Sequence, residues 1–205
     1  MPVIHLVRHG QASADAADYD VLSALGDRQA RVAGTEFARR GLRDPFVVCG
    51  TLDRQRDTAD ALIAAAGLDV AAHVDPRWNE YDHLDLLTRY PMAATGTVQD
   101  YVDHALTSWI EDPDGGWQAF QDDAVAALAA VSGAARNAIV VTSGGVIAAV
   151  CGALLGVPPA GIVALNRVSV NVGITTLVHG SRGTSLLTFN DHAHLAADRS
   201  LLTYR

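Results

Sequence analysis

"VIHLVRHGQAS", residues 3–13, is an apolar run that stops abruptly at Arg8, His9 and Gly10. A continuous apolar run rich in β-branched residues predicts a buried strand over 3–8. A cation, an imidazole and a glycine at its end are typical of a loop that binds an anion. A strand that meets an ordinary loop can look the same, so the rest of the sequence has to separate the two interpretations.

Strand-like and helix-like segments alternate along most of the chain. Apolar runs predict buried strands, and apolar side chains at helical spacing predict helices. The predicted strands are residues 3–8, 46–50, 69–76 and 137–143, followed by a hairpin-like pair over 168–180 and 184–191. The predicted helices are residues 23–41, with Ser23 as the cap, 53–67, 98–111, 117–133 and 144–156. This alternation predicts an α/β fold with a largely parallel sheet that helices cover on both faces.

Length and composition favour one domain, residues 1–205. The chain has 205 residues, of which 49% are hydrophobic, and this is enough for one sizeable core. The net charge is -8 without a basic run, so we expect no nucleic-acid partner. No signal peptide and no bilayer-spanning stretch is recognisable, so we expect a cytoplasmic protein without a membrane partner. Cys49 and Cys151 lie far apart in apolar runs, and buried thiols suit a reducing compartment.

Three of the predicted strands end in groups that can bind an anion. The first ends in Arg8 and His9, and the segment after the second, "GTLDRQRDT", carries Arg54 and Arg56. The third ends in "TSGG" at the N-terminus of a predicted helix. Ligands of α/β proteins bind at the carboxyl ends of the strands, and both arginine forks and helix N-termini suit a phosphate. We therefore expect these three ends to converge on one phosphate.

The segments "LVRHGQAS", "TLDRQRDTA", "RWNEYD" and "VVTSGGVI" resemble the motifs of the histidine phosphatase, or phosphoglycerate mutase-like, superfamily. The resemblance covers the chain from Val3 to about His194. It implies a three-layer α/β/α sandwich with a mostly parallel central sheet and a lid or insertion at about residues 77–116. It also implies a phosphomonoester phosphatase that acts through a phosphohistidine on a small phosphorylated metabolite, with no metal and no other cofactor.

The same resemblance implies a role for each motif residue. His9 is the expected nucleophile, which requires a neutral imidazole with one free nitrogen. Arg8 and Arg54 are expected to bind the phosphoryl group. Glu80, in "RWNEYD", matches the acid that protonates the leaving oxygen and then activates water. The other residues expected to bind substrate are Gln11, Ser13, Ser143, Gly144 and His194.

Some neighbouring residues are weaker candidates. Asp82 and His83 lie beside the expected acid and are second choices for its role. Arg56 does not match the motif, so we expect it at the surface. Trp109 and Trp117 are expected to pack inside the region that covers the pocket, because buried tryptophan is common in cores.

One position departs from the family pattern. The family usually carries a second histidine before the glycine at the end of the third strand, where this chain has Ser143. Serine donates a hydrogen bond but supplies no positive charge, and a lost charge-assisted bond costs about 1.5–3 kcal/mol. That cost corresponds to roughly one to two decades in rate, so we expect weak activity. His192 or His194 could replace the missing histidine, or either could be an ordinary loop residue.

Other functions stay open from the sequence. A phosphoglycerate mutase-type phosphotransferase shares the phosphohistidine, and a phosphate-binding module keeps the pocket without turnover. A serine hydrolase is disfavoured, since Val141 stands where the G-x-S-x-G elbow needs its first glycine. A metal site at Asp191, His192 and His194 is disfavoured because the spacing is loose. The lid has few cations, which favours a less charged leaving group, and the apolar stretches leave room for a homodimer.

Overall fold

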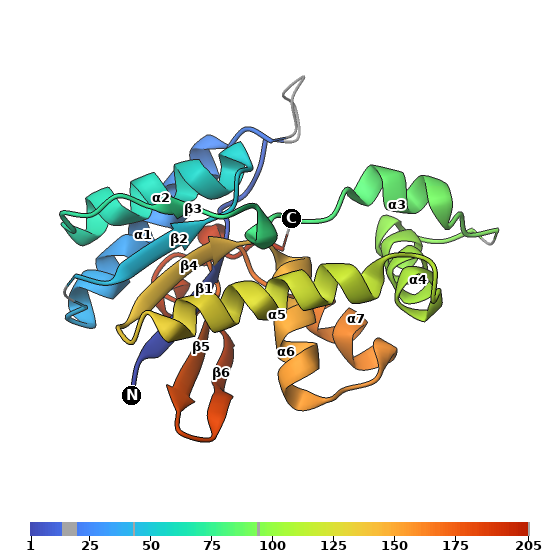
Figure 1. Cartoon of the computed structure of the whole chain (residues 1–205). Coiled ribbons are helices and arrows are strands. Elements are labelled where there is room, and N and C mark those ends of the chain that lie inside the picture. The colour runs from blue at the N-terminus through green and yellow to red at the C-terminus, as the bar shows by residue number, and fades with distance from the viewer. Residues whose placement is uncertain (14–19, 43, 94, 205) are drawn as a thin grey trace.

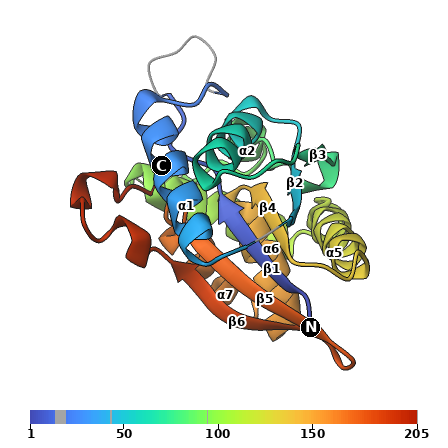
Figure 2. The same cartoon turned by 90° about the vertical axis from the view of Figure 1, so that its left-hand side faces the viewer.

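The computed structural model describes residues 1–13, 20–42, 44–93 and 95–204. Within these ranges the strands form one sheet in the order β3-β2-β4-β1-β5-β6 (Figure 1). The strands are β1 (Val3–Arg8), β2 (Phe46–Cys49), β3 (His73–Val74), β4 (Ala138–Thr142), β5 (Ile174–Gly180) and β6 (Gly183–Asp191). Strands β1 to β4 pair in parallel, and the hairpin of β5 and β6 joins β1 in the antiparallel direction. The expected mostly parallel sheet with a C-terminal hairpin is confirmed (Figure 2).

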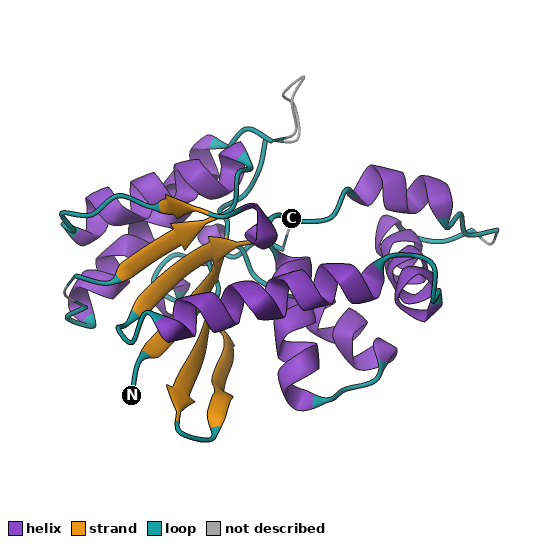
Figure 3. Cartoon of the chain, in the orientation of Figure 1, coloured by secondary structure: helices purple, strands orange, loops and turns teal. Residues whose placement is uncertain are grey.

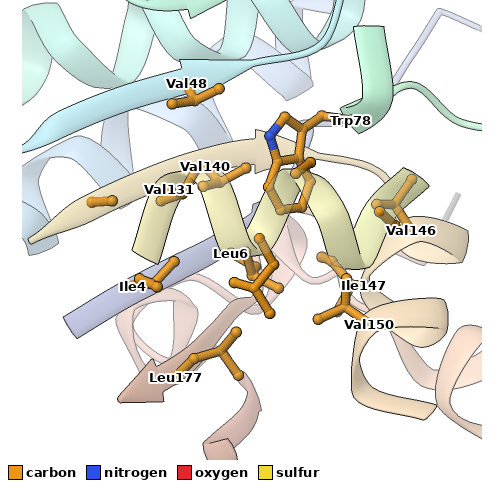
Figure 4. Packing of buried hydrophobic residues seen from close by; sticks show 14 of the residues in the cluster. Ile4, Leu6, Val48, Trp78, Val131, Val140, Val146, Ile147, Val150 and Leu177 are labelled. Carbon is orange, nitrogen blue, oxygen red and sulfur yellow. The ribbon is translucent and has the colours of Figure 1, made fainter. Parts of the chain in front are cut away.

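Helices cover both faces of this sheet (Figure 3). The helices are α1 (Ala24–Arg39), α2 (Asp53–Ala66), α3 (His83–Arg89), α4 (Val98–Glu111), α5 (Trp117–Gly133), α6 (Gly144–Leu155) and α7 (Pro159–Val168). On one face, Val7 of β1 and Ile139 of β4 pack against α1 and α2. On the other face, Leu6 and Val140 pack against α5 and α6 (Figure 4). Side chains that alternate along a strand thus fill two separate cores, and the chain is the expected three-layer α/β/α sandwich.

Helices α3 and α4 pack on each other beyond the sheet, and α4 also packs on α7 (Figure 1). A third apolar cluster holds them there, and it includes Leu106, Trp109 and Trp117. The two tryptophan rings pack edge to face with centroids 5.1 Å apart, so both fill the interior as the sequence predicted. None of the helices that the structure describes is both long enough and apolar enough to cross a membrane.

Two parts of the sequence prediction were wrong. A strand was expected over residues 69–76, but in the structure it covers only His73–Val74. This short strand, β3, lies at the edge of the sheet, pairs with β2 alone, and both of its residues are exposed. Helices α3 and α7 were not predicted. Asp82 caps the start of α3, where its side chain accepts hydrogen bonds from two backbone amides. The helix has only seven residues, and its periodicity is too weak for the sequence to indicate it. Helix α7 starts at Pro159, directly after the apolar segment of α6, and was not separated from it in the sequence.

The packing of α1 on α2 gives a stability prediction. A Cβ atom at Gly34 would lie 2.4 Å from the carbonyl oxygen of Leu62, so the two helices touch through a glycine. We expect Gly34→Ala to lower the free energy of unfolding by about 1–3 kcal/mol, because the helices must move apart. Gly133→Ala is the matched control, since a Cβ atom there meets nothing within 4 Å. Thermal unfolding of both variants tests this, and equal melting temperatures would contradict it.

Candidate active site

His9 follows β1 directly and its backbone is fixed on both sides. Its N–H donates to the carbonyl of Thr142 at 2.8 Å, and its own carbonyl accepts from the Asn171 side chain at 3.0 Å. The next residue passes very close to α1, because a Cβ atom at Gly10 would lie 2.5 Å from the carbonyl oxygen of Gly26. Only glycine fits this passage, and the loop holds the imidazole at the carboxyl end of the sheet.

The hydrogen bonds of His9 define its tautomer. Nδ1 lies 2.7 Å from the carbonyl oxygen of Gly10, and a carbonyl can only accept, so Nδ1 carries the proton. Nε2 then has a lone pair, and it accepts a bond of 3.3 Å from Nε of Arg54. Burial, and then the charges of Arg8 and Arg54, hold the pKa of His9 well below its ordinary value. The imidazole is therefore neutral at pH 7, which is the form that a nucleophile needs.

Arg54 is held by an acid that the sequence did not single out. Asp20 accepts from Nη1 of Arg54 at 2.7 Å and from the backbone N–H of Asp53 at 2.8 Å. Helix α2 has no side-chain cap of its own, so Asp20 both completes the helix N-terminus and orients the guanidinium. No motif marks Asp20, because its role depends on a contact with a helix that begins 33 residues later.

Arg8 is anchored to the C-terminal part of the chain. Its Nη1 donates to the carbonyl oxygens of Ser169 and Tyr204, the latter at 3.0 Å. The segment that ends at Tyr204 therefore lies beside the carboxyl ends of the strands (Figure 1). This contact positions one of the two arginines on which the expected phosphate site depends.

Glu80 occupies the helix N-terminus that the sequence analysis assigned to a phosphate. Its Oε2 accepts from the backbone N–H of Gly145, the second residue of α6, at 3.0 Å. Its Oε1 is buried without a hydrogen-bond partner among the described residues. Burial raises the pKa of Glu80, and the bond from Gly145 and the charges of Arg54 and Arg8 oppose this only in part. A Cβ atom at position 145 would lie 2.3 Å from Oε1, so the glycine is what lets the carboxyl group approach.

Ser143 lies beneath the pocket surface, where it does not line the cavity. The residue is fully buried, and its hydroxyl accepts a bond of 2.9 Å from the side-chain amide of Gln55. The same amide donates to the carbonyl of Trp78 at 3.0 Å. Ser143 was expected to bind the phosphate; in the structure its hydroxyl contacts Gln55, and the residue is not among those that line the pocket. Gly144 does line the pocket, as predicted.

Other expected residues lie outside the pocket. Gln11 bonds to the side chains of Gln29 and Ser23 at the start of α1, and Ser13 donates its N–H to the carbonyl of Val21. His194 is partly buried near Asp191, Glu36 and Arg40, on the other side of β1 from α6. His192 is exposed and bonds to a backbone carbonyl. None of these four residues is among those that line the pocket.

The weaker candidates from the sequence differ in where the structure places them. Arg56 is exposed and lies 3.7 Å from Asp53, as expected for a solvated side chain. Asp82 caps α3, and these hydrogen bonds lower its pKa, so it is poorly suited to act as an acid. His83 does face the pocket. In the part of the chain that the structure describes, no group of three or more histidine, cysteine and acidic side chains could hold a metal ion.

These groups line a pocket of about 300 Å³. Its lining residues are Arg8, His9, Arg54, Glu80, Tyr81, His83, Val98, Gln99, Val102, Gly144, Asn166, Arg167 and Tyr204. The structure therefore brings together four of the predicted catalytic and binding side chains and the predicted glycine. Of the remaining lining residues, Tyr81 lies within the segment "RWNEYD" and His83 was a second-choice acid, whereas no short motif indicated those from α4, α7 and the C-terminal segment.

The chain is similar to several known proteins. The chain matches the family model described as the histidine phosphatase superfamily (branch 1) over residues 4–192. A mycobacterial glucosyl-3-phosphoglycerate phosphatase in complex with VO3 is 25% identical with a TM-score of 0.66, and the alignment covers 94% of this chain and 100% of that one. No curated protein matches the chain.

Two further solved structures show a likeness of fold. A phosphoserine phosphatase from Entamoeba histolytica is 18% identical with a TM-score of 0.69, over 95% of this chain and 100% of that one. A putative alpha-ribazole-5'-P phosphatase from Escherichia coli K-12 is 20% identical with a TM-score of 0.67, over 93% of this chain and 98% of that one.

Proposed function

Because this chain belongs to branch 1 of the histidine phosphatase superfamily, we propose that it is a phosphomonoester phosphatase that acts through phospho-His9 on a small phosphorylated metabolite. One observation carries the proposal. A neutral His9 presents the lone pair of Nε2 next to Arg54, in the same pocket as a carboxyl group whose pKa is raised. A nucleophile and an acid in these protonation states are what phosphoryl transfer from an ester to water requires.

The first half-reaction moves the phosphoryl group to the protein. Arg8 and Arg54 bind the phosphoryl oxygens, and Nε2 of His9 attacks phosphorus from the side opposite the leaving oxygen. The P–O bond breaks as the N–P bond forms, and Glu80 gives its proton to the departing alkoxide. Most of the rate enhancement comes from positioning and from offsetting charge on the equatorial oxygens, where the arginines act.

The second half-reaction returns the protein to its starting state. Glu80, now a carboxylate, takes a proton from a water molecule that attacks phosphorus. The N–P bond breaks, and its electron pair returns to Nε2 of His9. The chain's own residues supply every proton transfer, so we propose that no metal ion takes part. Because position 143 carries a serine, no imidazole adds charge there, and we propose a correspondingly low rate.

We also propose that α3 and α4, within residues 77–116, form the lid of a single domain that spans residues 1–205. Val98, Gln99 and Val102 of α4, and His83 of α3, all line the pocket on the side away from the sheet. These side chains lie where the leaving group of a bound ester would extend. The lid therefore selects the substrate, while the ends of the strands hold the phosphoryl group.

A pH-rate profile tests this function. We expect the purified protein to hydrolyse an alkyl ester such as glycerol 3-phosphate in the presence of a chelator, with kcat bell-shaped in pH, because the departing alkoxide needs a proton. The acid limb lies below the ordinary histidine pKa, because His9 must lose its proton and its pKa is lowered. The alkaline limb lies above the ordinary glutamate pKa, because Glu80 must keep its proton and its pKa is raised. Activity only with added metal, or a rate that keeps rising with pH, would contradict the proposal.

A further inference from the structure

The outer part of the pocket is built by two helices that pack on each other. From α4 come Val98, Gln99 and Val102, and from α7 come Asn166 and Arg167. Both valine side chains give this wall an apolar surface. A leaving group that reaches past the catalytic residues meets these side chains.

One acid, Asp103, accepts hydrogen bonds from two side chains of this wall, those of Gln99 and Arg167. Oδ2 of Asp103 accepts from Nε of Arg167 at 2.8 Å and also from its Nη2. Oδ1 of the same carboxylate accepts from the side-chain amide of Gln99 at 2.8 Å. The Asp103 side chain is only 15% exposed, whereas that of Arg167 is 52% exposed. The carboxylate is thus largely shielded from water, and the guanidinium is at the pocket surface.

The Asp103–Arg167 pair determines which charges surround the leaving group of a bound ester. Beyond Arg8 and Arg54, which bind the phosphoryl group, Arg167 is the one arginine or lysine among the described lining residues. Its charge is offset by Asp103. Burial lowers the pKa of His83, so this side chain is neutral at pH 7 and adds no cation. A carboxylate on the substrate would lose water without gaining a cation, which costs free energy.

We propose that the Asp103–Arg167 pair makes the pocket select phosphomonoesters of uncharged alcohols with an apolar face and disfavour esters that carry a carboxylate. Val98 and Val102 contact the apolar face. This inference names the substrate class of the function proposed above and rests on that function for the phosphoryl end of the pocket. The pair disfavours ligands with a carboxylate, because Asp103 already neutralises the charge of Arg167.

A matched pair of substrates isolates the carboxylate. Glycerol 3-phosphate and 3-phosphoglycerate differ in that one has a hydroxymethyl group where the other has a carboxylate. We expect the wild type to favour glycerol phosphate by at least about tenfold in kcat/KM, since a missing charge-assisted bond is worth that much. Asp103→Asn keeps the shape of the side chain but frees the charge of Arg167. It should reduce this preference by at least about tenfold.

Two further variants make the result specific. Asp85→Asn removes an acidic charge from α3, where Asp85 lies 3.7 Å from Arg89 and outside the pocket lining, and should leave the ratio unchanged. Asp103→Asn combined with Arg167→Gln should restore the wild-type ratio, which a general loosening of the fold would not do. A wild type that prefers 3-phosphoglycerate overturns the proposal. So does an Asp103→Asn ratio within about twofold of the Asp85→Asn ratio.

Binding separates this inference from the proposed function. Calorimetry of the two esters on His9→Ala, with and without Asp103→Asn, gives the same ratio without turnover. If no ester is hydrolysed but the binding ratio shifts as expected, the phosphatase proposal fails and the charge inference stands. If hydrolysis occurs and neither ratio shifts, the charge inference fails and the phosphatase proposal stands.

Discussion

Replacing His9 with alanine should abolish turnover, with kcat on p-nitrophenyl phosphate falling by at least about 10³-fold. The variant keeps Arg8, Arg54 and Glu80 but has no nitrogen to accept the phosphoryl group. Quenching the wild type during turnover of a labelled ester should trap one phosphate per chain, stable in base and labile in acid. The variant should trap none, while inorganic phosphate still binds to its arginines.

His192→Ala is the matched control, because this histidine is exposed and bonds only to a backbone carbonyl. It should keep both the rate and the trapped label. A label that persists in His9→Ala would show that another residue is the nucleophile. A wild type that binds phosphate but neither turns over nor carries a label would instead favour a phosphate-binding module.

Replacing Glu80 with glutamine should split the reaction into a fast half and a slow half. The amide oxygen still accepts from the N–H of Gly145, so the loop keeps its place, but the group cannot donate or take a proton as an acid does. Esters of alkyl alcohols should lose about 10²–10⁴-fold in kcat, because their oxygen needs the proton to leave. With p-nitrophenyl phosphate, whose leaving group needs no acid, we expect a burst of one p-nitrophenolate per chain and then slow release of phosphate.

Asp82→Asn is the control for this experiment and also tests the second candidate acid. Asparagine caps a helix as well as aspartate does, so α3 should remain intact and the rate should stay within about twofold. The alkaline limb of the pH profile should vanish in Glu80→Gln and persist in Asp82→Asn. If Asp82→Asn shows the larger loss, or Glu80→Gln shows no burst, the assignment of the acid is wrong.

The sequence predicted the parts of the site that follow strands. His9 and Arg54 follow β1 and β2, and the apolar runs of these two strands predicted both positions in the fold. Parallel strands then bring these ends together by topology alone. Glu80 was reached only through the family resemblance, because nothing local distinguishes it from a surface acid. Its buried contact with α6 depends on Gly145, which lies 65 residues away.

The parts that the sequence did not predict are contacts between distant segments. Asp20 orients Arg54, Gln55 bonds to Ser143, and the Tyr204 carbonyl accepts from Arg8. Each of these residue types is ordinary at its place, and only the folded chain shows its partner. Ser143 illustrates the limit well. Its hydroxyl accepts from Gln55, a residue of α2 that the motif does not indicate.

The position of β1 in the sheet has a consequence for how the chain is made. Its two neighbours are β4 and β5, so Arg8 pairs with Thr142 and Val7 with Ile174. A ribosome adds about 5–20 residues per second, so β1 waits on the order of ten seconds for either partner. Helices α1 and α2 can pack on each other during this time, but the strand before His9 remains an unpaired apolar segment that a chaperone can bind. His9 therefore leaves the ribosome long before the strands that hold it, and only a nearly complete chain can have an active site.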